Sequence, residues 1–376
     1  MVPTILCLGL FEDAVLGVAD YVKSHDPAVQ IRAVKYSQAR HLSGDTKGVV
    51  AHLTGQGHLD ELRNAGDFPI VNTSGVRESL QVTTTRFDDH EIGRLAAEHL
   101  RGRGHRRFAC VTRTWEDYAH RRHTAFAEVI QSVELDCHVF ERDAVLTEPP
   151  VHRDFARWLA ELPKPVGVFG VTDDIAAECI FTAEELGIPI PQDVAILGAG
   201  DTTRLVEVVR PTISSVRTPW RLLGYRAAEQ LYRMIGGDAP PVQADPILVQ
   251  PESVVTRQSS DTFAVEDELV RSALRYIAEH IHEQINVTDL LRALPVSRRV
   301  LEVRFREHLG RTPLKEIHRQ RIERAKQLLI RTDLTVETVA VQAGFTNKVR
   351  FTDIFKRQIG LPPAEFRSQY QLRPSN

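Results

Sequence analysis

Cysteine, methionine and long apolar runs are all scarce in this sequence of 376 residues. The four cysteines, Cys7, Cys110, Cys137 and Cys179, lie far apart without metal-ligand spacing, which favours free thiols in a reducing cytoplasm. No stretch reaches the roughly eighteen apolar residues that a membrane span needs. The apolar run at 4–10 is followed by acidic residues and predicts a buried strand, not a signal peptide. We therefore expect a cytoplasmic protein without a membrane segment, metal or cofactor.

The sequence also lacks the patterns of an enzyme active site. The glycines at 102 and 104 precede a strand instead of following one, so they predict a turn and not a phosphate-binding loop. His282 is not followed by the second histidine of a zinc motif. Asp88 and Asp173 could form an acid–base pair, but no nucleophile accompanies them. We expect no enzyme, with a sugar-acting enzyme as the weakest alternative.

The first 260 residues alternate between strand-like and helix-like segments, and this alternation predicts mostly parallel sheets with helices on both faces. Ligands of such sheets bind beyond the carboxyl ends of the strands, where polar and aromatic side chains gather in this sequence. Carboxylates and guanidinium groups bind hydroxyls, and an aromatic ring covers the apolar face of a sugar, so we predict a polyhydroxylated ligand. An Asp at a helix start could instead be only a cap. The candidate ligand-binding residues are Glu12, Asp88, Trp115, Arg122, Thr172, Asp173 and Asp201.

Residues 286–370 contain two short helix pairs about fifty residues apart, joined by one helix predicted over 313–329. Ser297 is the candidate N-cap of the second helix in the first pair. Thr346, which follows the turn at Gly344, is the candidate N-cap of the second helix in the second pair. The N-terminal turn of such a second helix is what a helix-turn-helix presents to base edges. The candidate DNA-binding residues are Arg298, Arg299, Glu302, Arg306, Asn347, Lys348 and Arg350.

Charge is distributed unevenly along the chain. From Leu290 to the end there are 18 Lys and Arg against 8 Asp and Glu, whereas the rest of the chain is acidic. A basic module attached to an acidic body is typical of duplex DNA binding, because phosphate contacts supply most of the sequence-independent affinity. The alternative is that these arginines only solvate helix surfaces.

Two sets of motifs resemble known families. The C-terminal set resembles AraC-type transcription regulators over residues 266–367, and its motif residues are Ala340, Gly344, Phe345, Phe351, Phe355, Lys356, Gly360, Pro363 and Arg367. The N-terminal set resembles the periplasmic-binding-protein-like domain of LacI-type regulators and comprises residues 88–104, Arg122 with Phe126, residues 172–176 and residues 190–198. This order of domains resembles the xylose operon regulators, and the resemblance covers nearly the whole chain.

The resemblance implies a two-lobed α/β sensor domain followed by an all-α domain with two helix-turn-helix motifs. We place the sensor at 1–258, a linker at 259–265 and the AraC-type domain at 266–376. Lobe 1 then holds about 3–104 plus 217–236, and lobe 2 about 107–214.

The resemblance further implies a homodimer that binds operator DNA and activates sugar catabolism genes when D-xylose or a related pentose fills the cleft. Its ligand candidates are Asp88, Arg122, Asp173 and the turn of Gly200 and Asp201. Gly200 stands where the family usually has an Asp, and Thr172 where many LacI-type proteins have Asn. A different small molecule or a protein partner therefore remains an alternative effector.

Overall fold

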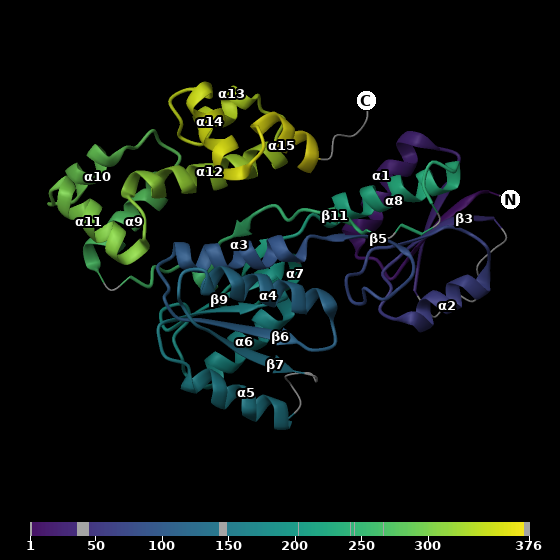
Figure 1. The fold of residues 1–376 in the computed structure, drawn as a ribbon, viewed down its shortest axis with the longest axis horizontal. Helices are drawn as coiled ribbons and strands as arrows, with labels where there is room; N and C mark the ends of the chain where they lie inside the picture. The colour runs from purple at the N-terminus through teal and green to yellow at the C-terminus, as the bar shows by residue number, and fades with distance from the viewer. Residues whose placement is uncertain are drawn as a thin grey trace.

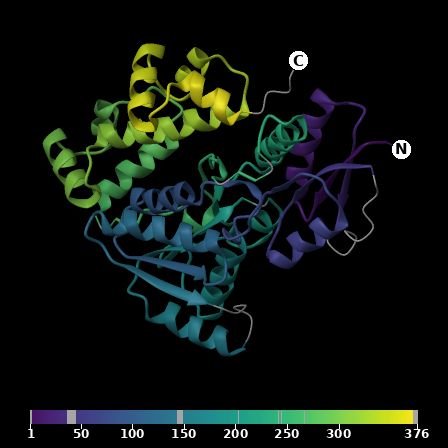
Figure 2. The same ribbon diagram turned by 45° about the vertical axis from the view of Figure 1, so that its right-hand side comes forward.

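The computed structural model describes residues 2–35, 45–142, 149–201, 203–240, 242–243, 245–265 and 267–371. Figure 1 shows two α/β lobes side by side and an all-helical domain along one side of them. In the view turned by 45°, the helical domain still lies along that same side of the lobes (Figure 2). No helix in these ranges is long and apolar enough to span a membrane.

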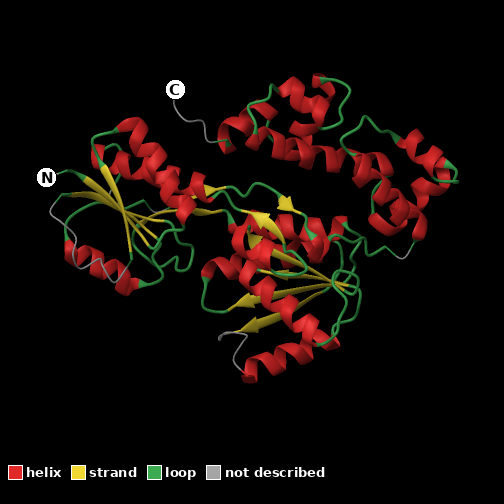
Figure 3. Ribbon diagram, turned by 180° about the vertical axis from the view of Figure 1, so that it is seen from behind, coloured by secondary structure: helices red, strands yellow, loops and turns green. Residues whose placement is uncertain are grey.

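The first lobe is built on a parallel sheet with the strand order β11-β5-β4-β3-β1-β2. Its strands are β1 (Thr4–Leu8), β2 (Gln30–Val34), β3 (Thr46–Ala51), β4 (Ile70–Asn72), β5 (Thr83–Phe87) and β11 (Ile247–Val249). The helices α1 (Glu12–His25), α2 (Gln56–Ala65) and α8 (Trp220–Gly236) cover it. Figure 3 shows both sheets of the molecule, each flanked by helices.

The second lobe has the strand order β12-β10-β9-β8-β6-β7, and only β12 is antiparallel to its neighbour. Its strands are β6 (Phe108–Arg113), β7 (Cys137–Arg142), β8 (Val166–Gly170), β9 (Val194–Gly200), β10 (Ser214–Arg217) and β12 (Val254–Val255). Its helices are α3 (Asp89–Gly102), α4 (Asp117–Gln131), α5 (Pro149–Glu161), α6 (Asp173–Glu185), α7 (Thr203–Val208) and the short η2 (Gln258–Ser260). The chain crosses between the lobes after β5, β10 and β11.

Helix α3 belongs to the second lobe, which corrects the division predicted from the sequence. Its apolar face, including Ile92 and Leu100, packs into the same core as Phe108 and Phe126. Gly93 lets α3 approach α4 closely, because a Cβ there would lie 2.2 Å from the Arg122 carbonyl oxygen. The boundary between the lobes therefore falls just before α3 and not after it.

The C-terminal domain consists of helices α9 (Glu268–His280), α10 (Val287–Ala293), α11 (Arg298–Leu309), α12 (Pro313–Arg331), α13 (Val336–Gln342), α14 (Lys348–Ile359) and α15 (Pro363–Tyr370). It has two apolar cores, and α12 contributes Ile317 to the first and Ile322 to the second. The predicted connector helix is thus confirmed, and it ends two residues later than expected. Because one continuous helix enters both cores, the two helix-turn-helix units are held in a fixed relation.

Candidate functional site

A cleft of about 360 Å³ lies between the two lobes, beyond the carboxyl ends of their strands. This volume is in the range of small-molecule sites, about 300–1,000 Å³. Residues that follow β1, β3 and β4 form one wall, and residues that follow β6, β8 and β9 form the other. The cleft therefore lies where ligands of doubly wound sheets bind.

Asp89 is the charged centre of the cleft and comes from the first turn of α3. Its buried carboxylate accepts hydrogen bonds from Arg122 Nε at 2.9 Å and Arg121 Nη2 at 2.8 Å, and Arg86 Nη1 lies 3.4 Å away. Arg122 also donates to the Val171 carbonyl oxygen at 2.8 Å. One carboxylate thus orders guanidinium groups from both lobes around the cavity.

The second lobe also presents Thr172 and Asp173 to the cleft, at the start of α6. Asp173 is buried and accepts a hydrogen bond from Ser215 Oγ at 2.5 Å. Thr172 does not use its hydroxyl as a cap, and this buried hydroxyl has no hydrogen-bond partner among the residues that the structure describes. A buried polar group without a partner is costly unless a ligand supplies one. Thr172 is therefore suited to hydrogen-bond a ligand hydroxyl.

Aromatic rings form a third side of the cleft. Trp220 lies 4.2 Å from Phe11 and 4.8 Å from Phe87 between ring centroids, and all three residues line the cavity. The Trp220 indole N–H is buried, and within the described ranges it has no hydrogen-bond acceptor. His52 also lines the cavity, where burial lowers its pKa to about 4, so the ring is neutral at pH 7.

Three of the seven predicted ligand-binding residues line this cleft, namely Arg122, Thr172 and Asp173. The other four, Glu12, Asp88, Trp115 and Asp201, are not among its lining residues. Asp88 caps α3 and accepts a hydrogen bond from Gln250 at 2.8 Å, and Asp201 is ion-paired with Arg217 and Arg257. Glu12 is exposed, and Trp115 lies beside Arg113.

Asp89 and Trp220 are among the cleft residues that the sequence interpretation missed. The pair Asp88-Asp89 at a helix start carried a usable signal, because only the first can be the N-cap and the second is then free for another role. Trp220 starts α8 directly after a crossover between the lobes, and no local pattern reveals that position.

The second functional surface is formed by the N-terminal turns of α11 and α14. Ser297 caps α11 as predicted, whereas Asn347 caps α14 in place of Thr346, since its side chain accepts from the Arg350 N–H at 2.8 Å. Arg299, Lys348 and Arg350 are exposed at these turns. Farther along α11, Glu302 is ion-paired with Arg298 at 2.9 Å and with Arg306 at 3.5 Å. Both helices thus present exposed cationic side chains at the ends that helix-turn-helix domains direct toward DNA.

A buried carboxylate fixes this domain to the sensor. Glu316 in α12 is fully buried and accepts from Arg311 at 2.6 Å and Arg319 at 2.7 Å. Arg311 also donates to the Gly102 carbonyl oxygen at 2.9 Å, at the end of α3. The DNA-binding domain is therefore attached to the second lobe through the helix that starts in the cleft.

Comparison with known families gives the same division of the chain. A periplasmic binding protein-like domain family matches residues 97–260, and a helix-turn-helix domain family matches residues 290–369. The cellobiose complex of the transcriptional regulator CelR superimposes on 68% of this chain and 84% of its own, with a TM-score of 0.56 and 20% identity. The fold and its exposed helices define a transcription regulator with a sensor domain in front of an AraC-type DNA-binding domain.

Full-length relatives identify the family. The xylose operon regulatory protein of Escherichia coli K12 is 31% identical over 310 residues, which cover 80% of this chain and 79% of the relative. That of Haemophilus influenzae is 29% identical over 285 residues, or 74% and 73% of the two chains. The structure of the xylose-binding transcription activator XylR covers 99% of this chain and 100% of its own, with a TM-score of 0.60 and 27% identity. This chain belongs to the family of xylose operon regulatory proteins.

Proposed function

We propose that this protein is a cytoplasmic homodimer that binds operator DNA and activates sugar catabolism genes when a small sugar, D-xylose or a related pentose, occupies the interlobe cleft. The observation that carries the proposal is the cleft itself, which combines buried carboxylates, guanidinium groups and an aromatic wall. The homologous E. coli and H. influenzae regulators take their name from the xylose operon.

The cleft suits a polyhydroxylated ligand. The Asp89 cluster and Asp173 offer charged acceptors and donors around the cavity, so they can bind several hydroxyls of a sugar ring. The Trp220 ring offers an apolar face, and its N–H together with the Thr172 hydroxyl offers two further hydrogen bonds.

Gly200 is the residue that bears on the identity of the sugar. Its φ is 129°, a conformation that residues with a side chain rarely adopt. The position lines the cleft without a carboxylate, so one hydroxyl acceptor of a pentose site is missing here. A related sugar with a different substituent at that position is the second candidate effector.

DNA recognition follows from the two exposed helix ends. Helix α12 has 19 residues and is therefore about 28 Å long, which keeps α11 and α14 roughly one turn of DNA apart. We propose that Arg299 and Arg350 read bases. The candidates Arg298, Arg306, Asn347 and Lys348 would orient these helices on the phosphate backbone. Glu302, which is ion-paired with Arg298 and Arg306, would position those two side chains.

Cleft closure can reach this domain because the domain contacts the second lobe and borders the first. Arg311 and Arg319 lie against the end of α3 in the second lobe, whereas Tyr370 lines a hollow together with α8 and β11 of the first lobe. A ligand that closes the cleft moves one lobe against the other and so changes how the domain lies between them. The effect on DNA affinity is limited by the difference in ligand affinity between the two states.

A panel of pentoses and hexoses tests the proposal by thermal shift of the full chain. A ligand at a hundred times its Kd adds about 2.7 kcal/mol to stability, so the melting temperature rises measurably. A higher melting temperature with D-xylose supports D-xylose as the effector. A higher melting temperature with another sugar changes the proposed effector but leaves the proposed regulator function in place. If no sugar raises the melting temperature, the sugar-sensing proposal fails.

The homodimer is a separate part of the proposal. Light scattering of the full chain tests it by measuring the mass of the particle in solution.

A further inference from the structure

A second cavity, of about 540 Å³, lies at the junction of the sensor and the DNA-binding domain. Five of its lining residues are arginines, two from the end of α3 and three from the DNA-binding domain, namely Arg101, Arg103, Arg311, Arg319 and Arg324. We propose that this cavity binds a small anion of the phosphate type, either inorganic phosphate or the phosphate group of a metabolite, and that the bound anion links the two domains.

The carboxylates near this cavity leave positive charge unbalanced. Glu316 is buried behind it and is shared by two of the arginines, and Asp261 is paired with Arg103 at 3.1 Å. The two carboxylates that line the cavity, Glu98 and Glu323, already have partners, Arg94 and Lys326. These acids therefore do not neutralise all five arginines.

Arg101 and Arg324 are the two arginines without a carboxylate partner among the described residues. Arg101 lies in the last turn of α3, and Arg324 uses only its Nε, which donates to the Gln342 carbonyl oxygen at 2.9 Å. Burial lowers the pKa of Arg311 and the Glu316 carboxylate raises it, while the neighbouring charges of Arg319 and Arg101 lower it. Guanidinium groups from two domains thus repel one another across one cavity, and a bound anion would remove that repulsion.

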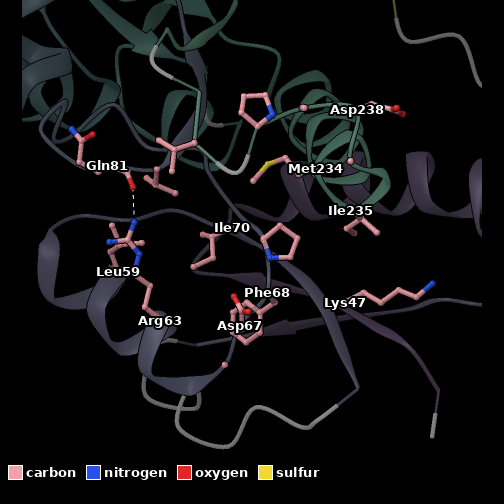
Figure 4. Close-up of a pocket in the computed structure, with 17 residues that line it drawn as sticks. Lys47, Leu59, Arg63, Asp67, Phe68, Ile70, Gln81, Met234, Ile235 and Asp238 are labelled. Carbon is pink, nitrogen blue, oxygen red and sulfur yellow. Dashed lines mark hydrogen bonds between the residues drawn. The ribbon is translucent and has the colours of Figure 1, made fainter.

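The chemistry of the lining suits an oxyanion such as phosphate better than a halide. Guanidinium groups bind phosphate oxygens with paired N–H donors, and Gln320, Gln327 and Thr256 add neutral hydrogen-bonding groups. By contrast, a larger hollow of about 1130 Å³ lies at the amino ends of the strands in the first lobe (Figure 4). Its two cations, Lys47 and Arg63, are equalled in number by Asp67 and Asp238, and Lys47 is ion-paired with Asp26, so it does not select an anion.

The junction cavity is separate from the sugar cleft. Glu98, Arg101 and Arg103 lie at the opposite end of α3 from Asp89, so an anion here acts on the docking of the DNA-binding domain without entering the cleft. An occupied site would hold the two domains together and make the docked arrangement more stable. The protein would then respond to a second chemical signal besides its sugar.

Isothermal titration calorimetry of the full chain tests this site, with inorganic phosphate, a pentose phosphate and the unphosphorylated pentose as probes. We expect one phosphate-type ligand per chain, and we expect the double variant R101Q/R324Q to weaken binding at least tenfold. The variant R63Q, which changes an arginine in the balanced hollow of Figure 4, is the matched control and should leave Kd unchanged.

The probes also separate the sources of the anion. Binding of inorganic phosphate supports a free-phosphate site, and binding of the pentose phosphate alone supports a metabolite site. The proposal is overturned if neither phosphate probe binds, if sodium chloride at equal ionic strength competes equally well, or if R101Q/R324Q binds as tightly as the parent. Circular dichroism and the sugar-induced thermal shift confirm that each variant is folded.

Discussion

Asp89 and Gly102 are the first and last residues of the same helix, and they lie in the two places that a ligand-controlled regulator must connect. The Asp89 carboxylate is the charged centre of the cleft, and the Gly102 carbonyl oxygen accepts a hydrogen bond from Arg311 of the DNA-binding domain. Thirteen residue steps of an α-helix span about 20 Å. Helix α3 is therefore a direct and stiff connection between the sugar site and the DNA-binding domain.

Replacing Asp89 with Asn should both destabilise the sensor and abolish its sugar response. The substitution leaves the guanidinium groups of Arg121 and Arg122 without their buried counter-charge, which costs about 3–5 kcal/mol. The neighbouring variant D88N is the matched control, because Asn caps a helix as well as Asp. Urea denaturation and sugar titration of D89N and D88N measure both effects. Equal stability and equal sugar affinity of the two variants would contradict this role of Asp89.

Replacing Gly198 with Ala should weaken sugar binding. A Cβ at this position would lie 2.5 Å from Asp173 Oδ1, so the carboxylate must move out of its place in the cleft wall. We expect Kd for the sugar to rise roughly tenfold, in line with the loss of one charged hydrogen bond. Gly57→Ala is the control, because nothing lies within 4 Å of a Cβ there. An unchanged Kd for G198A would exclude Asp173 from ligand binding.

Replacing Arg299 or Arg350 with Ala should cost about 1–3 kcal/mol of operator affinity and reduce the preference over random DNA. Both side chains are exposed at the N-terminal turns of α11 and α14. Arg275, exposed on α9 outside the two helix-turn-helix units, is the control. Fluorescence anisotropy with operator and random duplexes measures both affinities. Equal losses on the two duplexes would mean that the residue contacts only phosphate.

The junction between the domains should be acid-labile through Glu316. Burial raises the pKa of this carboxyl, but Arg319 and Arg311 outweigh burial and lower the pKa to about 2. A lowered pKa in the folded state stabilises the protein at pH values above the ordinary Glu pKa of about 4.3. This stabilisation is lost as the pH falls from there toward 2. The expected contribution at pH 7 is about 3 kcal/mol.

The variant E316Q isolates this contribution. At pH 7 it should unfold at a lower urea concentration than the parent. The difference should narrow between pH 4.5 and pH 3, because the Glu316 carboxyl of the unfolded parent takes up a proton in this range while that of the folded parent does not. A difference that stays constant over this range would show that Glu316 acts through packing and not through its charge.

The sequence by itself determined the helices of the DNA-binding domain and the class of the protein. The Ser297 cap, the connector helix from Pro313 and the turn at Gly344 are local features, since each depends on residues three or four positions apart. The alternation of strands and helices likewise predicted parallel sheets. The motif residues from Ala340 to Arg367 also lie close together in the sequence, so their spacing was enough to show the resemblance to the AraC-type family.

Tertiary structure alone decided which side chains meet. Asp89 and Arg122 are 33 positions apart, and the arginines of the junction cavity come from segments more than two hundred residues apart. The lobe that α3 joins was also decided by packing, because its apolar face fits either sheet by pattern, and its contacts with the core of the second lobe and with α4 select one. Periodicity fixes the inward face of a helix, but the partner of that face depends on the path of the whole chain.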